Sequence, residues 1–225
     1  MKNKTNKQEE TEIELANKKG AKIPTKQKIL FCAVDWFSTK GYASTTIRDI
    51  SASVGINSAS LYSHFSSKEE ILQFMLNDFA DRTQTMFNNP EMPSILRKEP
   101  TAEGVLSCMQ ISLSVLSDEY YSKVLHVLYH EQHHNTIIRN YIAKTIIDIE
   151  AYVEKIITIL KSQSIIRSDA DPDFWKKITS SLLYAFPDRM MLGIEDNAPD
   201  FSVKDLEGLL FYLFEMLFQI HGDSR

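Results

Sequence analysis

The stretch from Thr45 to Lys68, TTIRDISASVGINSASLYSHFSSK, limits the possible folds of this chain more than any other. Thr46, followed three residues later by Asp49, predicts a capping box at the start of a short helix. Apolar residues then recur at helical spacing as far as Val54. Gly55 predicts a tight turn, because glycine adopts a left-handed backbone at little steric cost.

A second short helix is expected directly after this turn. Asn57 or Ser58 can cap it, and its apolar positions are Leu61 and Phe65. A further capping box beginning at Ser67 then opens a longer helix. Two short helices joined by a glycine-containing turn form a helix-turn-helix, whose second helix enters the DNA major groove. The alternative is a structural helical hairpin that never meets DNA.

The motifs in this stretch resemble those of a known family. Thr-Ile-x-Asp-Ile, Val-Gly-Ile and Leu-Tyr-x-His-Phe-x-x-Lys-Glu-Glu-Ile-Leu follow one another at the spacing typical of TetR-type transcriptional regulators, over about residues 25–76. The resemblance implies an all-α protein of about nine helices, with an N-terminal helix-turn-helix domain and a C-terminal helical domain. It further implies a homodimeric repressor, not an enzyme and without a cofactor. Such a repressor binds a palindromic operator in double-stranded DNA and is released by a small effector.

Composition and charge agree with a helical, cytoplasmic protein. Seven Gly and seven Pro in 225 residues disfavour a turn-rich β fold, and no alternating strand pattern is present. The net charge is −5, but residues 1–70 hold eleven Lys/Arg against eight Asp/Glu, so the acidic excess lies further along the chain. Two widely spaced cysteines, no secretory signal and no apolar run of about 20 residues predict a cytoplasmic protein without membrane contact.

The chain is expected to fall into three parts. Residues 1–23 are polar and rich in Lys and Glu, which predicts a disordered tail. Residues 24–70 form the DNA-binding domain, and a helix over 68–87 leads out of it. Residues 88–225 form the effector-binding and dimerisation domain. Three prolines predict a loop over 88–100, and Pro187 is expected to kink or split a helix that begins after Pro172.

The resemblance assigns DNA contacts residue by residue to the helix-turn-helix. Hydroxyls and free amides at the start of the first helix suit a phosphate, and side chains at the start of the second reach base edges. The expected contact residues are Thr45, Thr46, Arg48, Ser58, Ala59, Ser60, Tyr62, Ser63, His64 and Lys68. Family members often carry Lys or Arg where this chain has Ser58 and Ser63. With about four to eight phosphate contacts per dimer, we expect a log–log salt slope of about −4 to −7.

Two helices near the C-terminus are apolar around much of their circumference, which predicts that they bury two faces. One face packs inward and the other packs on a second copy, as a palindromic operator requires. The residues expected at this dimer interface are Phe174, Ile178, Leu182, Phe186, Leu206, Leu210, Leu213, Phe214 and Leu217. The alternative is a single large monomeric core.

A competing motif lies in the second half of the chain, where His130, Glu131 and His134 fit the His-Glu-x-x-His pattern. Two histidines four apart on a helix can share a zinc ion, with the glutamate as general base. His126 lies one turn earlier, which also allows a metal sensor. This pattern supports a zinc-dependent hydrolase or metal sensor as the alternative function, and a purely structural helical adaptor is a third possibility. The main prediction contains no metal ligand and no catalytic residue.

Large, soft side chains are frequent in the same half of the chain, and most of them are expected to be core. The family resemblance adds an apolar effector pocket with a few polar groups. The residues expected to line it are Met109, Leu113, Leu116, Tyr120, Tyr129, His130, His133, Phe174 and Tyr184. A hydrophobic effector is expected from this composition.

Overall fold

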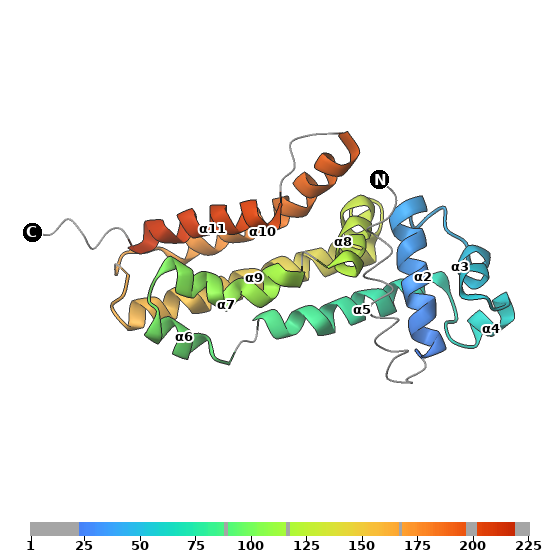
Figure 1. The fold of residues 1–225 in the computed structure, drawn as a ribbon, viewed down its shortest axis with the longest axis horizontal. Coiled ribbons are helices and arrows are strands. Elements are labelled where there is room, and N and C mark those ends of the chain that lie inside the picture. The colour runs from blue at the N-terminus through green and yellow to red at the C-terminus, as the bar shows by residue number, and fades with distance from the viewer. Residues whose placement is uncertain (1–22, 88–89, 116–117, 167, 197–201, 219–225) are drawn as a thin grey trace, which may run out of the picture. The chain divides into compact units, whose positions relative to one another are not determined.

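The computed structural model describes residues 23–218, apart from 88–89, 116–117, 167 and 197–201 (Figure 1). Within these ranges it contains helices and no strand, which confirms the all-α class. The chain divides into two compact units between Met75 and Leu76. Because the described residues begin at 23, the tail predicted over residues 1–23 lies almost entirely outside them.

The first unit is a small helical domain built on α2 (Thr25–Lys40), α3 (Ile47–Val54) and α4 (Ser58–Tyr62). The first two turns of α5 (Lys68–Phe87) complete it. Its core side chains come from all four helices and from the connections between them. They are Ile29, Leu30, Ala33, Val34, Phe37, Tyr42, Ile50, Leu61, Phe65, Ile71, Leu72 and Met75.

Short-range signals in the sequence set the ends of these helices. Pro24 occupies the position before α2, and the helix ends at Gly41, whose φ of 83° is readily adopted only by glycine. Gly55 ends α3 in the left-handed conformation, with φ 77° and ψ 31°. The turn predicted at Gly55 is therefore confirmed.

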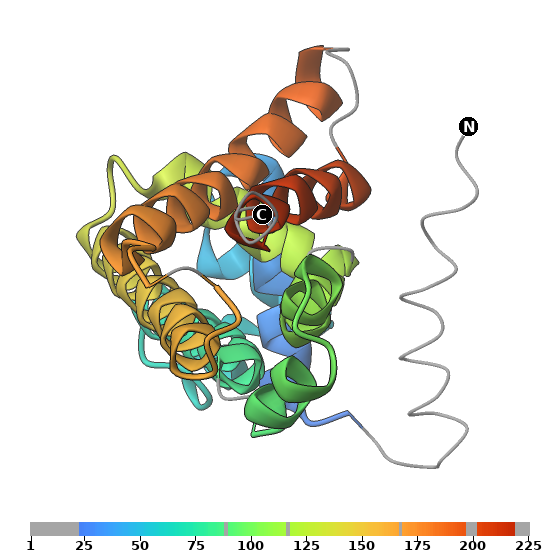
Figure 2. The same cartoon turned by 90° about the vertical axis from the view of Figure 1, so that its left-hand side faces the viewer.

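The second unit contains α6 (Met92–Lys98), α7 (Ala102–Val115), α8 (Glu119–Glu131), α9 (Thr136–Ser162), α10 (Pro172–Asp196) and α11 (Val203–Phe218). α9 packs along α10, and α11 packs along α7, as Figures 1 and 2 show. Asp118 and Asn135 cap α8 and α9 with their side-chain oxygens.

Five helices supply one apolar core in this unit. Its fully buried side chains include Leu96 of α6, Val105 of α7, Ile156 of α9, Phe186 of α10 and Phe214 of α11. The buried Tyr152 hydroxyl of α9 donates a hydrogen bond of 2.7 Å to the Cys108 carbonyl of α7. The hydroxyl is therefore satisfied inside the core, and its bond links α7 to α9.

One prediction about prolines is wrong, and of the kink or split expected at Pro187 the split is excluded. The expected loop over 88–100 contains α6, because a proline at position 93 stands at the start of a helix, where its missing N–H costs nothing. α10 is one helix from Pro172 to Asp196, so Pro187 does not split it. Within the described residues, α6 is the one helix that the sequence did not predict.

No helix in the described ranges combines the length and the apolar character that crossing a membrane requires.

Candidate nucleic-acid interface

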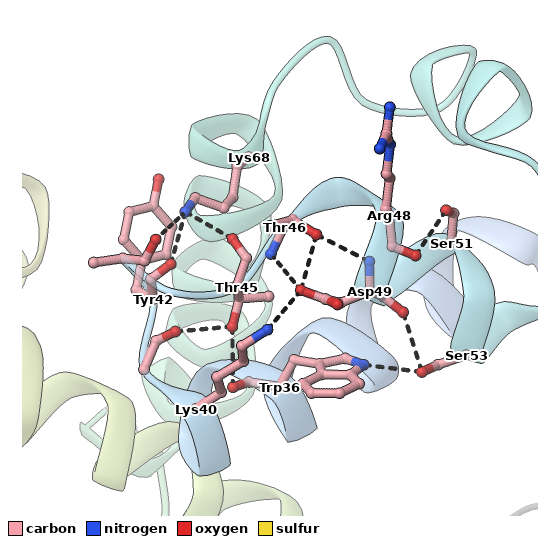
Figure 3. Close-up of polar contacts among 12 residues, drawn as sticks. Trp36, Lys40, Tyr42, Thr45, Thr46, Arg48, Asp49, Ser51, Ser53 and Lys68 are labelled. Carbon is pink, nitrogen blue, oxygen red and sulfur yellow. Dashed lines mark hydrogen bonds and ion pairs between the residues drawn. The ribbon is translucent and has the colours of Figure 1, made fainter.

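The start of α3 is fixed by a reciprocal pair of hydrogen bonds (Figure 3). The Asp49 backbone N–H donates to the Thr46 hydroxyl, and the Thr46 backbone N–H donates to the Asp49 carboxylate. The Lys40 ammonium forms an ion pair with the same carboxylate at 3.0 Å. Together these partners, above all the Thr46 backbone N–H, lower the pKa of Asp49 to about 2. The predicted capping box is confirmed, and it occupies the Thr46 hydroxyl.

The second helix of the motif, α4, begins at Ser58. Asn57 caps it, because its side-chain oxygen accepts a hydrogen bond of 2.7 Å from the Ser60 backbone N–H. Leu61 is completely buried and points α4 onto the core of the first unit. The opposite side of α4 is therefore left to solvent.

Four of the expected contact residues form this exposed side of α4. Ala59, Ser60, Tyr62 and Ser63 are all exposed, and Tyr62 keeps 54% of its surface accessible. Their methyl, hydroxyl and phenol groups can contact thymine methyls, base edges and phosphate oxygens. The described structure therefore presents a small, polar and nearly uncharged surface at the motif.

Three further expected residues flank this surface. Arg48 is exposed on α3, and its side chain points away from the capping box in Figure 3. Ser58 is half-buried, with its hydroxyl 3.3 Å from the hydroxyl of Ser51 on α3. His64 is also half-buried. Of the three, Arg48 is the one whose charged end reaches into solvent.

Thr45 is placed differently from the prediction. Its side chain is only 1% exposed, and its hydroxyl donates to the Gly41 carbonyl at 2.8 Å and lies 3.2 Å from the Trp36 carbonyl. A phosphate cannot reach a hydroxyl that is buried and bonded in this way. Thr45 therefore shapes the turn before α3 and does not face DNA.

Lys68 also differs from the prediction. Its ammonium group donates to three backbone carbonyls, those of Tyr42 at 2.7 Å, Thr45 at 2.9 Å and Ala43 at 3.2 Å (Figure 3). It also lies 4.4 Å from the centre of the Tyr42 ring. An ammonium has three N–H donors, and here each has a carbonyl acceptor. The Lys68 charge that was expected to contact a phosphate is instead bonded to backbone carbonyls of its own domain.

Other lysines of the first unit have internal partners as well. Lys26 lies over the rings of Phe65 and Phe74, at 4.9 and 4.6 Å from their centres. Lys40 is paired with Asp49. Within the described part of this unit, Arg48 and the exposed Lys28 are the cations without such a partner.

Six of the nine residues predicted at the dimer interface are buried in the core of their own chain. They are Phe186, Leu206, Leu210, Leu213, Phe214 and Leu217. Ile178 and Leu182 pack against the same core, and Phe174 is exposed with its ring edge-on to Trp175. The prediction assigned the inward face of α11 to the interface, because two apolar faces on one helix cannot be told apart without its neighbours.

The outward face of α11 carries its own apolar stripe. Leu209, Tyr212 and Met216 are 43%, 72% and 56% exposed, and their spacing places them on one side of the helix. The sequence contained this signal, since these positions alternate with the buried ones. Sequence reasoning missed them because the buried stripe is equally apolar.

The histidine motif does not have the geometry that the zinc alternative requires. α8 ends at Glu131, so His134 lies in the following turn and not one helical turn beyond His130. His126 and His130 do stack, with ring centres 4.1 Å apart. Across the described ranges, however, no three His, Cys, Asp or Glu side chains gather as a metal site would need. The helical spacing assumed by the zinc prediction is therefore wrong.

The residues predicted to line a pocket are brought together only in part. Tyr129 and Tyr184 meet, with ring centres 5.6 Å apart; the Tyr129 hydroxyl donates to the Tyr184 carbonyl, and the Tyr184 hydroxyl to the Gln132 side chain. Tyr120 instead donates to Asp78 of α5 at 3.1 Å.

The other predicted pocket residues are scattered. Met109 is in the core, and His130, His133 and Phe174 are exposed. The side chains of Leu113 and Leu116 lie outside the described residues.

The N-terminal part of the chain is similar to known regulators. Residues 29–75 match the bacterial regulatory proteins of the tetR family. The transcriptional repressor KstR2 of Mycolicibacterium smegmatis is 45% identical over 56 residues, which is 25% of this chain and 27% of that protein. The negative regulator IcaR of the icaADBC biofilm operon in Staphylococcus epidermidis is 56% identical over 46 residues, 20% of this chain and 25% of that protein. The chain thus spans about a quarter of the length of these relatives.

Solved structures extend the likeness in fold to most of the chain. A transcriptional regulator of the TerR/AcrR family from Aquifex aeolicus aligns with a TM-score of 0.60 and 22% identity, covering 87% of this chain and 100% of that one. GusR of Salmonella enterica aligns with a TM-score of 0.59 and 17% identity, covering 86% of this chain and 96% of that one. At these identities the alignments concern the fold alone. Residues 29–75 thus form a helix-turn-helix domain of the kind found in the tetR family of bacterial regulatory proteins.

Proposed function

We propose that this protein is a cytoplasmic, homodimeric transcriptional regulator that binds a palindromic operator in double-stranded DNA. The observation that carries the proposal is the exposed side of α4, which holds Ala59, Ser60, Tyr62 and Ser63 within the family's DNA-binding domain. Side chains at this position in a helix-turn-helix contact base edges in the major groove. Both named relatives are negative regulators, which supports repression as the direction of control.

A palindromic operator needs two copies of this surface, and the outward face of α11 supports a second copy there. An exposed stripe of Leu209, Tyr212 and Met216 costs free energy in water unless another surface covers it. A two-fold dimer places the same stripe on both protomers, so each covers the other. The interface we propose therefore replaces the inward residues of α11 with its outward ones.

Regulation by a small, hydrophobic effector completes the proposal. Tyr129 and Tyr184 bring two aromatic rings with polar ends together between α8 and α10, which suits an apolar ligand with a few polar groups. Binding there would favour a dimer geometry that no longer matches the operator.

Capture and footprinting of genomic DNA test the DNA-binding part. We expect the wild-type protein to retrieve a small set of fragments and to protect a two-fold symmetric sequence on each. Tyr62→Ala should keep the helical circular dichroism signal and lose the footprint, because Tyr62 lies on the surface and supports no core. Ile147→Ala is the matched control, since Ile147 is 65% exposed on α9 of the other unit. Recovery of no specific fragment by the wild-type protein, or full binding by Tyr62→Ala, would contradict the proposal.

Ligand screening by thermal shift tests the effector part. A compound that binds the folded protein raises its unfolding temperature, by an amount that grows with the logarithm of its concentration relative to its Kd. We expect at least one such hydrophobic compound to weaken operator binding at saturating concentration. Retention of full operator affinity with every compound that binds would contradict effector release while leaving DNA binding intact.

A further inference from the structure

We propose that Lys68 is the residue through which α5 positions the DNA-reading helices, and that it makes no phosphate contact. This inference rests on the proposed function in one respect, namely that α3 and α4 read DNA. The observation behind it is the set of three hydrogen bonds from one ammonium group to the carbonyls of Tyr42, Ala43 and Thr45.

Lys68 is the first residue of the helix that both units share along the chain. α5 runs without interruption from Lys68 to Phe87, and the boundary between the units falls inside it, after Met75. In its first two turns, Ile71, Leu72 and Met75 are fully buried in the first unit. These apolar contacts pack one side of α5 against the first unit, whereas the hydrogen bonds of Lys68 fix the N-terminal end of the helix.

The three carbonyls belong to the turn that leads into α3. Thr45 is the last residue before the cap, and its hydroxyl closes the same turn by donating to Gly41. Thr46 then caps α3. Fixing the carbonyls of this turn therefore fixes where α3 starts, and α4 follows because Ser51 and Ser58 join the two helices.

Lysine suits this position for a physical reason. Three carbonyl oxygens that converge on one point repel one another unless a group with several donors lies between them. An ammonium supplies three N–H groups around a single charge, and the Tyr42 ring 4.4 Å away favours that charge further. The planar guanidinium of arginine has its donors in a fixed fork and does not match this arrangement. A displacement of the start of α5 must therefore carry the turn, and with it α3.

Substitution of Lys68 separates positioning from phosphate contact. Lys68→Met keeps the length of the side chain and removes all donors, and Lys68→Arg keeps the charge. Lys28→Met removes an exposed cation from the same unit and serves as the control. The DNA is the footprinted fragment recovered with the wild-type protein.

The salt dependence of binding gives the first result. For a positioning residue, we expect Lys68→Met to lower affinity about ten- to a hundredfold with an unchanged salt slope, because charged hydrogen bonds are strong. Lys68→Arg should lower DNA affinity to a similar extent, although it keeps the charge. A salt slope shallower by about 2 per dimer, together with rescue by arginine, would show a phosphate contact and overturn the inference.

Amide hydrogen exchange gives the second result, and part of it needs no DNA. In the free protein, Lys68→Met should speed exchange over residues 42–50 about tenfold while Lys28→Met leaves it unchanged. At saturating DNA, residues 68–76 should become slower to exchange in the wild-type protein but not in Lys68→Met, although residues 58–64 are protected in both. Equal protection of residues 68–76 in both proteins would overturn the transmission role.

A measurement on the wild-type protein covers the case in which Lys68→Met does not fold. In protein labelled with ¹⁵N-lysine, the Lys68 ammonium should give a slowly exchanging resonance in the free state that is unchanged by DNA. A resonance that appears or shifts only with DNA would assign Lys68 to a phosphate. If the wild-type protein binds no DNA, the proposed function fails. The hydrogen exchange and the ammonium resonance of the free protein then still decide whether Lys68 is bonded to the three carbonyls.

Discussion

Thr46 and Asp49 satisfy each other at the start of α3. The Asp49 backbone N–H donates to the Thr46 hydroxyl at 3.2 Å, while the Asp49 carboxylate accepts from the Thr46 backbone N–H at 2.9 Å. Two amides that would otherwise lack partners in the helix are thereby bonded. Since α3 has only eight residues, its stability depends on this cap more than that of a longer helix would.

Removing the cap should therefore destabilise the first unit. We expect Thr46→Ala to lower the free energy of unfolding by about 1 kcal/mol, because the hydroxyl acceptor for the Asp49 amide is lost. Urea unfolding followed by circular dichroism measures the change. Thr25→Ala is the control, since Thr25 is exposed at the start of α2 and makes no cap there. Equal effects of the two substitutions would show that the cap contributes nothing.

The same contacts predict how stability responds to acid. The Thr46 backbone N–H, then the Lys40 ammonium, lower the pKa of Asp49 from 3.8 to about 2 in the folded protein. A carboxylate with a depressed pKa stabilises the fold above its unfolded pKa, and this contribution disappears as the pH falls through the folded pKa. We therefore expect Asp49→Asn to flatten the pH dependence of the unfolding midpoint between about pH 4 and pH 2. An unchanged profile between wild type and variant would contradict this linkage.

Local signals explain why the helix-turn-helix could be predicted from the sequence. The signals are Thr46 with Asp49, Gly55 and Asn57. Each acts on residues only a few positions away, so a short stretch of sequence is enough to reveal it. The starts of α5 and α9 follow from the same kind of signal, at Ser67 and Asn135. The exposed side of α4 follows from the burial of Leu61, which its apolar spacing already indicated.

Contacts between distant residues explain what could not be predicted. Lys68 lies 23 residues or more from the carbonyls that it bonds, so no local pattern distinguishes it from an exposed lysine. One apolar face of α11 packs into the core of its own unit and the other is exposed, and this difference is set by distant helices such as α7.

Arg48 should supply much of the charge that this surface offers to DNA. Lys26, Lys40 and Lys68 already have partners within the first unit, whereas Arg48 points into solvent. We expect Arg48→Ala to weaken binding to all DNA sequences similarly and to make the salt slope shallower by about 2 per dimer. Titrations at several salt concentrations measure it, with Arg97→Ala, an exposed arginine of α6, as the control. An unchanged slope would mean that Arg48 contacts bases or nothing.

The last prediction concerns the outward face of α11. Tyr212 and Met216 are the most exposed apolar side chains of that helix, and a carboxylate in their place would be buried unpaired in a dimer. We therefore expect Tyr212→Glu with Met216→Glu to convert the dimer to a monomer in sedimentation equilibrium, without loss of helix. Ile147→Glu, at an exposed site of α9, should leave the mass unchanged. Because each monomer reaches one half-site, the double variant should also lose operator binding while keeping an intact α4 surface. A double variant that remains a dimer would place the interface on another face.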